Sequence, residues 1–193
     1  MAIASEWRSL PLAASMRKGD ELMFPVFFLT LTTYGTWLPG DERGWVDGST
    51  SSGENRLRPG DAVREKRARL RMRGQAVYLS PEQRRLVEET IRRVAGYCRW
   101  HILAMSVRSN HVHVVVQSND VTPEGVMSKF KAWCSRRLNE QCRELSVEVP
   151  VRWWTRHGST RYLNDEKSVE AAVQYVVEGQ DRKTSRGGMR SQH

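Results

Sequence analysis

The stretch Arg108-Ser-Asn-His-Val-His-Val-Val-Val-Gln117 decides the fold of this chain. In a β-strand, successive side chains point to opposite faces of the sheet. One face of this segment is therefore formed by Val112, Val114 and Val116, and the other carries His111 and His113. The alternation predicts a half-buried strand that packs through valine and presents two imidazoles on its other side.

The two histidines are candidates for metal coordination, because imidazole nitrogen is a common ligand and both rings point the same way. The alternative is a pair of histidines that are only hydrogen-bonded at a sheet edge. Two other histidines are interpreted as structural: His157 precedes a glycine at an expected turn, and His101 starts an expected strand.

The elements around this strand follow from their own signals. Residues 24–34 are rich in aromatic and β-branched side chains and predict a strand. Ser80-Pro81 opens a helix to about residue 97, residues 101–108 form a strand, and Ser109-Asn110 form a tight turn into the histidine strand. Thr122 caps a second helix, whose apolar stripe contains Trp133.

Two further elements complete the pattern. Residues 151–163 look like a hairpin that turns at residues 157–158, and Asn164 or Asp165 then caps a last helix that runs to about residue 179. This order predicts an α+β, ferredoxin-like antiparallel sheet with two helices on one face and the last helix beside the other. On that last helix, Tyr175 lies off the apolar stripe.

The chain is expected to form one domain over residues 24–180. Residues 1–23 are expected to be a flexible leader and residues 181–193 a disordered tail. Residues 35–75, rich in Gly, Pro, Asp, Ser and Arg, are too long for a simple connection and predict a basic insertion whose second half forms a short helix.

The composition favours a polyanionic partner. The 193 residues carry a formal net charge of +9, and the excess is rich in arginine, which suits phosphate contacts. No apolar run is long enough to span a bilayer, and the three cysteines lack Cys-x-x-Cys spacing, so we expect a protein of the reducing cytoplasm without a membrane partner. Nucleic acid is the first expectation.

Single-stranded DNA is bound by positive charge along its backbone and by aromatic rings under its bases. Trp37, Trp45, Trp153 and Trp154 have the right chemistry, although at most one of the adjacent pair is expected to be exposed. The run from residue 64 to residue 73 is the densest basic segment, and it is either a DNA contact or a solvated loop. The candidates for DNA contact are Trp37, Arg64, Lys66, Arg67, Arg152, Trp154, Arg156 and Arg161.

The chain resembles the single-tyrosine HUH transposases of single-strand insertion sequences and the related REP-associated tyrosine transposases. The resemblance rests on Asn110-His-Val-His-Val for the HUH motif and on Tyr175-Val-Val-Glu-Gly-Gln180 for the tyrosine helix. The stretches at residues 33–44 and 154–161 are also similar to segments of one branch of the family. The resemblance implies a prokaryotic protein that acts at the nucleoid on single-stranded or hairpin DNA, as a monomer or a homodimer.

The resemblance also implies a mechanism. A divalent ion, Mg²⁺ or Mn²⁺, would be held by His111 and His113, and Tyr175 would attack the scissile phosphorus to form a 5′-phosphotyrosine link. Relatives complete the metal site with a polar side chain one turn after the tyrosine, where this chain has Gly179. We expect Gln180 as third ligand, although in an unbroken helix it would point about 140° away from Tyr175. Glu178 is the alternate.

Three other functions are compatible with the same residues. A replication initiator or relaxase would use the same chemistry in a larger protein. A domesticated, catalytically inactive DNA-binding module would keep the arginines and tryptophans. A metal-dependent nuclease that uses water would need acidic ligands, and Asp120 and Glu124 are the nearest in sequence.

Overall fold

A computed structural model describes residues 17–18, 21–22, 25–46, 57–119 and 121–178 of the chain. The expected tail and most of the expected leader lie outside these residues, as do Asp120, Gly179 and Gln180. The strands are β1 (Arg17–Lys18), β2 (Glu21–Leu22), β3 (Val26–Thr32), β4 (Trp45–Val46), β5 (Leu57–Arg58), β6 (His101–Val107), β7 (His111–Gln117) and β8 (Ser159–Leu163). The helices are α3 (Ala62–Leu70), α4 (Pro81–Cys98), α5 (Pro123–Glu144) and α6 (Glu166–Glu178).

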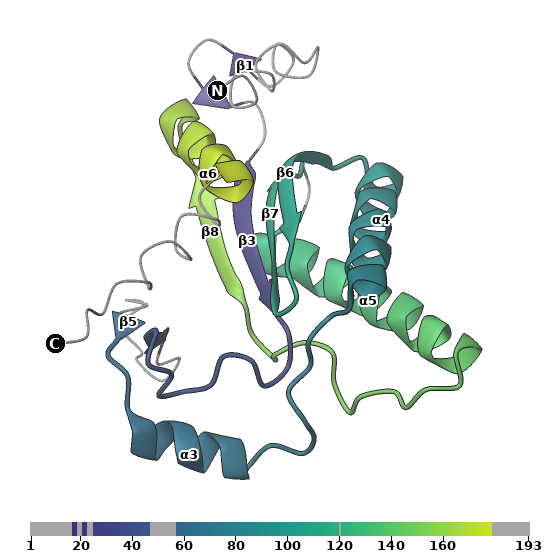
Figure 1. The fold of residues 1–193 in the computed structure, drawn as a ribbon. Helices are drawn as coiled ribbons and strands as arrows, with labels where there is room; N and C mark the ends of the chain where they lie inside the picture. Colours follow the sequence, from purple (N-terminus) through teal and green to yellow (C-terminus); the bar gives the residue numbers. More distant parts are fainter. Residues whose placement is uncertain (1–16, 19–20, 23–24, 47–56, 120, 179–193) are drawn as a thin grey trace, which may run out of the picture.

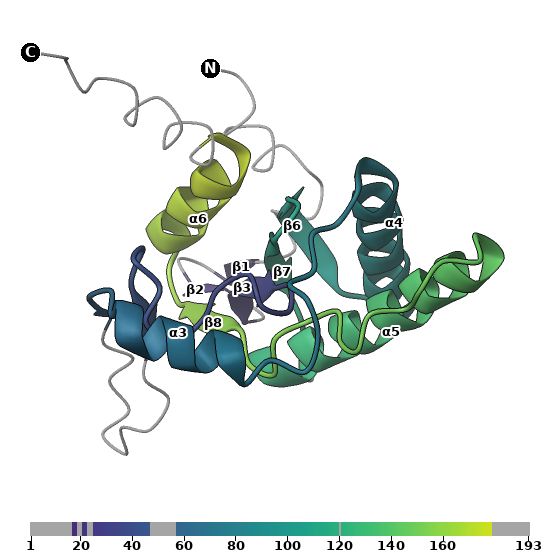
Figure 2. The same cartoon turned by 60° about the horizontal axis from the view of Figure 1, so that its bottom comes forward.

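The central sheet has four strands in the order β6-β7-β3-β8, and each neighbouring pair is antiparallel. With α4 between β3 and β6 and α5 between β7 and β8, this is the ferredoxin-like arrangement predicted from the sequence. The helices α4 and α5 lie on one side of the sheet and α6 on the other (Figures 1 and 2). The predicted α+β fold class is confirmed.

The local signals for the first two long helices act as expected. Ser80 and Gln83 form a reciprocal capping box at the start of α4, with Pro81 in the first helical position. At the start of α5, the side chain of Thr122 accepts a hydrogen bond from the amide of Gly125. These caps satisfy amides that would otherwise lack partners, so each helix begins where the sequence predicts.

The tight turn before the histidine strand is also confirmed. The amide of Arg108 donates to the carbonyl of His111 at 2.8 Å, and Val107 pairs with Val112, so only Ser109 and Asn110 lie between the hydrogen-bonded residues Arg108 and His111. A turn of two residues fixes the register of β7, and with it the face on which every side chain of the strand lies.

The valine face of β7 is completely buried. Val112, Val114 and Val116 are each 0% exposed and belong to one core with α4 and α5. Phe130 of α5 stands edge-on to Trp100 in this core, with ring centroids 5.6 Å apart. Burial of this layer is the main source of apolar stabilisation on this side of the sheet.

On the opposite face, α6 packs against part of the sheet. Asp165, one of the two expected caps, accepts the amide of Ser168 at the start of α6. The predicted apolar stripe of α6 is buried: Val169, Ala172, Val173 and Val176 pack with Val26, Ala104, Val115 and Leu163 of the sheet. This cluster occupies the part of the face around Val115, so the histidines lie next to it on the same strand.

The expected hairpin over residues 151–163 is wrong. Both halves of the segment lie along β3 instead of along each other: Thr33 bridges Trp154, and Thr30 pairs with Ser159. The residues between them form a long bulge on that edge, which Lys131 holds by donating to the carbonyls of Thr155 and His157.

The placement of Trp133 in the core stripe of α5 is also wrong. Its side chain is 44% exposed, whereas Cys134 beside it is fully buried. Trp133 lies at the margin of the apolar stripe, about 60° from Phe130 around the helix, and its large ring extends into solvent from there.

The segment after β3 contains regular structure. β4 pairs with β5, and the basic helix α3 follows, beyond the end of the sheet where β3 ends (Figure 1). No residue of α3 is buried. The predicted domain limits remain a prediction, and none of the described helices is both long and apolar enough to cross a membrane.

Candidate active site

His111 and His113 lie side by side on the face of β7 that α6 borders. Their ring centroids are 4.7 Å apart. His113 is 8% exposed, and His111, at the start of the strand, is half-buried. The two rings therefore form one compact pair with a partly open side.

The Nδ1 atom of each imidazole has a partner within the protein. His111 Nδ1 lies 2.8 Å from Oδ1 of Asn110, and His113 Nδ1 lies 2.9 Å from the hydroxyl of Thr30. Hydrogen bonds of this kind orient metal-ligating histidines and direct Nε2 towards the ion. Burial, together with the charges of His111 and Arg108, lowers the pKa of His113 to about 3, so this ring is neutral at pH 7, as a ligand must be.

Tyr175 is close to this pair and comes from the same chain. Its ring centroid lies 5.6 Å from that of His113, and the side chain is 41% exposed. Phe28 of β3 packs against both rings, 5.3 Å from His113 and 6.0 Å from Tyr175. The tyrosine is thus off the buried stripe of α6, as predicted, and its ring stands beside the histidines.

Of the three arginines expected near the groove, Arg161 is in contact with this cluster. Its guanidinium carbon lies 5.4 Å from the ring centroid of Phe28. Arg152 instead lines a cleft of about 400 Å³ between α5 and residues 150–154, together with Lys131 and Trp153. Arg156 is exposed in the bulge.

The tryptophans expected to stack on DNA bases differ in exposure. Trp154 is 6% exposed and Trp153 is 5% exposed, and both belong to the core formed with α4 and α5. The expectation that Trp154 presents a free ring is therefore wrong. Trp45 is also buried, whereas Trp37 is 40% exposed.

The basic residues expected to bind DNA outside the site lie on α3. Arg64, Lys66 and Arg67 are all exposed. The guanidinium of Arg64 stacks on Trp45, with its carbon 4.5 Å from the ring centroid. The helix thus presents a strongly positive surface on a segment that makes no core of its own.

The third metal ligand is not found in the described part of the chain. Gln180 lies outside it, and within it no three His, Cys, Asp or Glu side chains gather closely enough to hold a metal ion. Glu178 accepts a hydrogen bond from Gln174 one turn earlier on α6 and does not complete such a group. Glu124 accepts from the hydroxyl of Thr160 at 2.6 Å.

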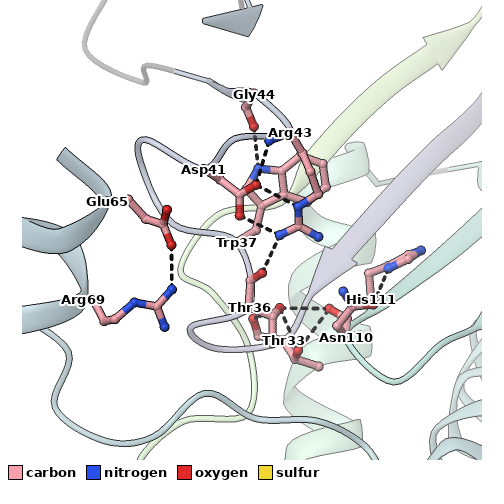
Figure 3. Close-up of polar contacts among 10 residues, drawn as sticks. All are labelled: Thr33, Thr36, Trp37, Asp41, Arg43, Gly44, Glu65, Arg69, Asn110 and His111. Atoms are coloured by element: carbon pink, nitrogen blue, oxygen red, sulfur yellow. Dashed lines mark hydrogen bonds and ion pairs between the residues drawn. The ribbon is translucent and has the colours of Figure 1, made fainter. Parts of the chain in front are cut away.

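Several residues around the site were not singled out from the sequence. Thr30 and Phe28 lie on the same face of β3, with Thr30 directly opposite His113 in the register. Strand alternation over residues 24–34 contained this signal, but only the pairing of β3 with β7 makes it specific. Thr33 and Thr36 hold the carbonyl of Asn110 next to His111 (Figure 3), and this loop contact has no periodic signal in the sequence.

Comparison with known proteins assigns the chain to a class. A family model described as "Transposase IS200 like" matches residues 70–179, a segment that contains both histidines and Tyr175. The chain therefore belongs to the IS200-like transposases, enzymes that act on DNA, as its resemblance to single-tyrosine transposases indicated. No curated protein sequence matches it.

Two solved structures are similar to this fold. A REP-associated tyrosine transposase bound to a REP hairpin is 12% identical, with 90% of this chain and 74% of that chain covered and a TM-score of 0.47. A candidate transposase from Deinococcus radiodurans R1 is 15% identical, with 85% of this chain and 97% of that chain covered and a TM-score of 0.43. Both likenesses are weak, and membership of the family rests on the match to residues 70–179.

Proposed function

We propose that this transposase cleaves and rejoins single-stranded DNA through a covalent link to Tyr175. The observation that carries the proposal is the contact between the Tyr175 and His113 rings, 5.6 Å apart, on the half-open face of the sheet. A tyrosine on a helix flank is ordinarily a packing residue. Here it is 41% exposed beside two candidate metal ligands, which suits a nucleophile.

The reaction conserves the energy of the phosphodiester. The phenolic oxygen of Tyr175 loses its proton and attacks the phosphorus, the bond from phosphorus to the 3′ oxygen breaks, and that oxygen takes a proton to become a 3′-hydroxyl. The product is a 5′-phosphotyrosine. Attack by a second 3′-hydroxyl on this link reverses the step and joins the new strand without an external energy source.

His111 and His113 would hold the divalent ion, Mg²⁺ or Mn²⁺. The fixed Nδ1 atoms described above fit this role, because they leave Nε2 of each ring as the ligating atom. When bound, the ion acts as a Lewis acid that neutralises charge on the phosphoryl oxygens. Two imidazoles are fewer ligands than an octahedral ion takes, and we propose Gln180 as a third protein ligand, with substrate oxygens and water completing the shell.

The DNA strand would be held by positive charge on both sides of the site. Arg161 lies against the Phe28 ring of the cluster, and we assign it to the scissile strand, together with Arg156 from the neighbouring bulge. We assign Arg152, which lines the cleft beside α5, to an adjoining part of the DNA. We assign the exposed cations of α3, Arg64, Lys66 and Arg67, to the stem of a DNA hairpin, because its backbone is anionic. The proposal applies equally to a monomer and a homodimer.

The test is formation of a covalent adduct. The purified protein is incubated with labelled single-stranded DNA from both flanks of its gene, in Mn²⁺ or in EDTA, and analysed on denaturing gels. We expect an SDS-resistant adduct that requires the metal and is absent from Tyr175→Phe. Tyr162→Phe is a matched control, because Tyr162 is also exposed (53%) but stands edge-on to Phe27, which belongs to the core on the opposite side of the sheet.

The other outcomes identify the alternatives. Tight binding without an adduct on any flank would contradict the proposal and indicate an inactive DNA-binding module. Metal-dependent cleavage that survives in Tyr175→Phe would indicate a nuclease that uses water. Such a nuclease would need acidic metal ligands. Glu124, one of the two acidic residues nearest to the histidines in sequence, accepts a hydrogen bond from Thr160 instead.

A further inference from the structure

Trp37 is held in a fixed orientation on the loop that follows β3. Its indole Nε1 donates to the carbonyl of Gly44 at 2.7 Å, and the guanidinium carbon of Arg43 lies 4.8 Å from its ring centroid (Figure 3). The side chain nevertheless remains 40% exposed. The loop therefore presents an aromatic ring to solvent while fixing its edge and one of its faces.

The arginine that packs on Trp37 is itself clamped. Arg43 donates from Nε and Nη2 to the carboxylate of Asp41, at 2.7 and 2.6 Å, and from Nη2 to the carbonyl of Thr36 at 2.8 Å. Asp41 is 8% exposed, and its hydrogen bond with Arg43 lowers the pKa of its carboxyl below the usual range. A two-point arginine–carboxylate pair of this kind is rigid, so Trp37 is positioned before any ligand binds.

The same loop is bonded to the turn that carries His111. The amide and hydroxyl of Thr33 donate to the carbonyl of Asn110 at 3.0 Å each, and the hydroxyl of Thr36 donates to it at 3.2 Å. The side chain of Asn110 in turn contacts His111 (Figure 3). The position of Trp37 is therefore tied to the position of the candidate metal ligands.

The loop also supports the start of the basic helix. The amide of Asp61, which caps α3, donates to the carbonyl of Gly40 at 2.8 Å. A side chain at Gly40 would collide with the backbone of Asp61 and Glu65, and its φ of +97° favours glycine, so α3 packs directly on this loop. One loop thus joins an exposed aromatic ring, a positive helix and the histidine turn.

We propose that Trp37 is a stacking platform for one unpaired base of the DNA strand that enters the His111, His113 and Tyr175 site. The inference rests on the proposed function and adds to it a residue that fixes the register of the strand. Aromatic rings beside positive charge bind single strands in this way, because every base has a π-face and the backbone is anionic. In duplex DNA the faces of the bases are already stacked, so the platform selects unpaired bases.

Trp133 provides a matched comparison. It is similarly exposed (44%), and Arg136 lies over its ring at 5.6 Å. It lies on α5, on the opposite side of the sheet from α6 (Figure 2). Exposure and a neighbouring arginine are thus common to both tryptophans, and the link to His111 distinguishes Trp37.

The experiment measures binding of fluorescein-labelled (dT)20 to the full-length protein by anisotropy. We expect Trp37→Ala and Trp37→Leu to weaken binding on the order of tenfold, and Trp37→Phe, which keeps an aromatic face, to remain within about threefold. Trp133→Ala should bind like the wild type. Binding of a 20-base-pair duplex should be the same for all variants, and circular dichroism verifies their folding.

The outcomes separate this inference from the proposed function. If Trp37→Leu binds (dT)20 like the wild type, the platform is wrong, and an adduct on Tyr175 in the same preparations would leave the proposed function intact. If binding falls with Trp37→Leu and not with Trp37→Phe but the wild type forms no adduct, the platform stands and the covalent chemistry fails. A wild-type protein that does not bind (dT)20 overturns the platform, and adduct formation on the flanking DNA then decides the proposed function by itself.

Discussion

The two faces of β7 show how one strand divides packing from chemistry. Val112, Val114 and Val116 are completely buried under two long helices. On the other face α6 covers the part around Val115, and His111, with the ring of Tyr175 close by, remains partly accessible. The two histidines and Tyr175 thus gather where α6 leaves this face of β7 partly open.

The difference teaches that the stability and the activity of this protein have separate structural origins. Because the well-packed face supplies most of the stability, the other face can carry reactive side chains that contribute little to it. Substitutions on the valine face should therefore change the free energy of unfolding, and substitutions on the histidine face should change catalysis at nearly constant stability.

The largest expected effect tests whether one chain alone supplies the complete active site. Since His111, His113 and Tyr175 come together in a single chain, a mixture of His111→Ala and Tyr175→Phe proteins should form no adduct with single-stranded DNA. When either variant is mixed with the wild type, the amount of adduct should be proportional to the fraction of wild-type protein in the mixture. Recovery of adduct in the mixture of the two variants would show that subunits exchange the tyrosine.

The next effect separates the stabilities of the two faces. Phe130→Ala removes a fully buried ring from the valine side and should lower the free energy of unfolding by about 3–5 kcal/mol. Tyr175→Phe should change it by less than about 0.5 kcal/mol, because the hydroxyl belongs to a partly exposed side chain. Guanidinium denaturation measures both values, and equal losses would contradict the division of roles.

A smaller effect is expected from charge on the histidine face. Arg161→Ala should weaken single-strand binding by about fivefold, because one phosphate contact is lost, without a change in stability. Arg161→Lys should recover part of the affinity. Arg85→Ala is the control, since Arg85 is exposed on α4 and pairs with Glu82. An equal loss in the control would mean that net charge alone determines binding.

The smallest effect tests how tightly the valine side is closed. Burial raises the pKa of the Cys134 thiol to about 12 and also raises the pKa of Cys142. At pH 8 these thiols are protonated, and iodoacetamide should modify Cys98 first, since the thiolate is the nucleophile. Peptide mapping of the labelled sites measures this order, and rapid labelling of Cys134 in the native protein would show that the core opens.

The sequence predicted the fold because its strongest signals are periodic. Alternation alone assigns Val114 and His113 to opposite faces, and helical spacing alone places Tyr175 off the buried stripe of α6. Both signals depend only on the geometry of regular backbone. The chain order of the elements then restricts the sheet to few topologies.

The remaining features lie where the backbone is irregular. Trp153 and Trp154 were expected to face opposite sides, as they would on a strand, but they precede a bulge and both reach the core. The contact of Arg43 with Asp41 joins residues two apart in a loop, where no period exists. Such contacts depend on tertiary structure, so no pattern in the sequence predicts them.

The two-residue turn before β7 has a consequence for how this protein tolerates genetic change. A point substitution alters one face of β7 and leaves the other in place. A one-residue insertion between His113 and Val114, with the valines kept in register against β3, would turn both imidazoles into the hydrophobic core without changing a single existing amino acid. For this strand, the count of residues is as much a determinant of activity as their identity, because a three-nucleotide insertion is enough to move both histidines to the other face.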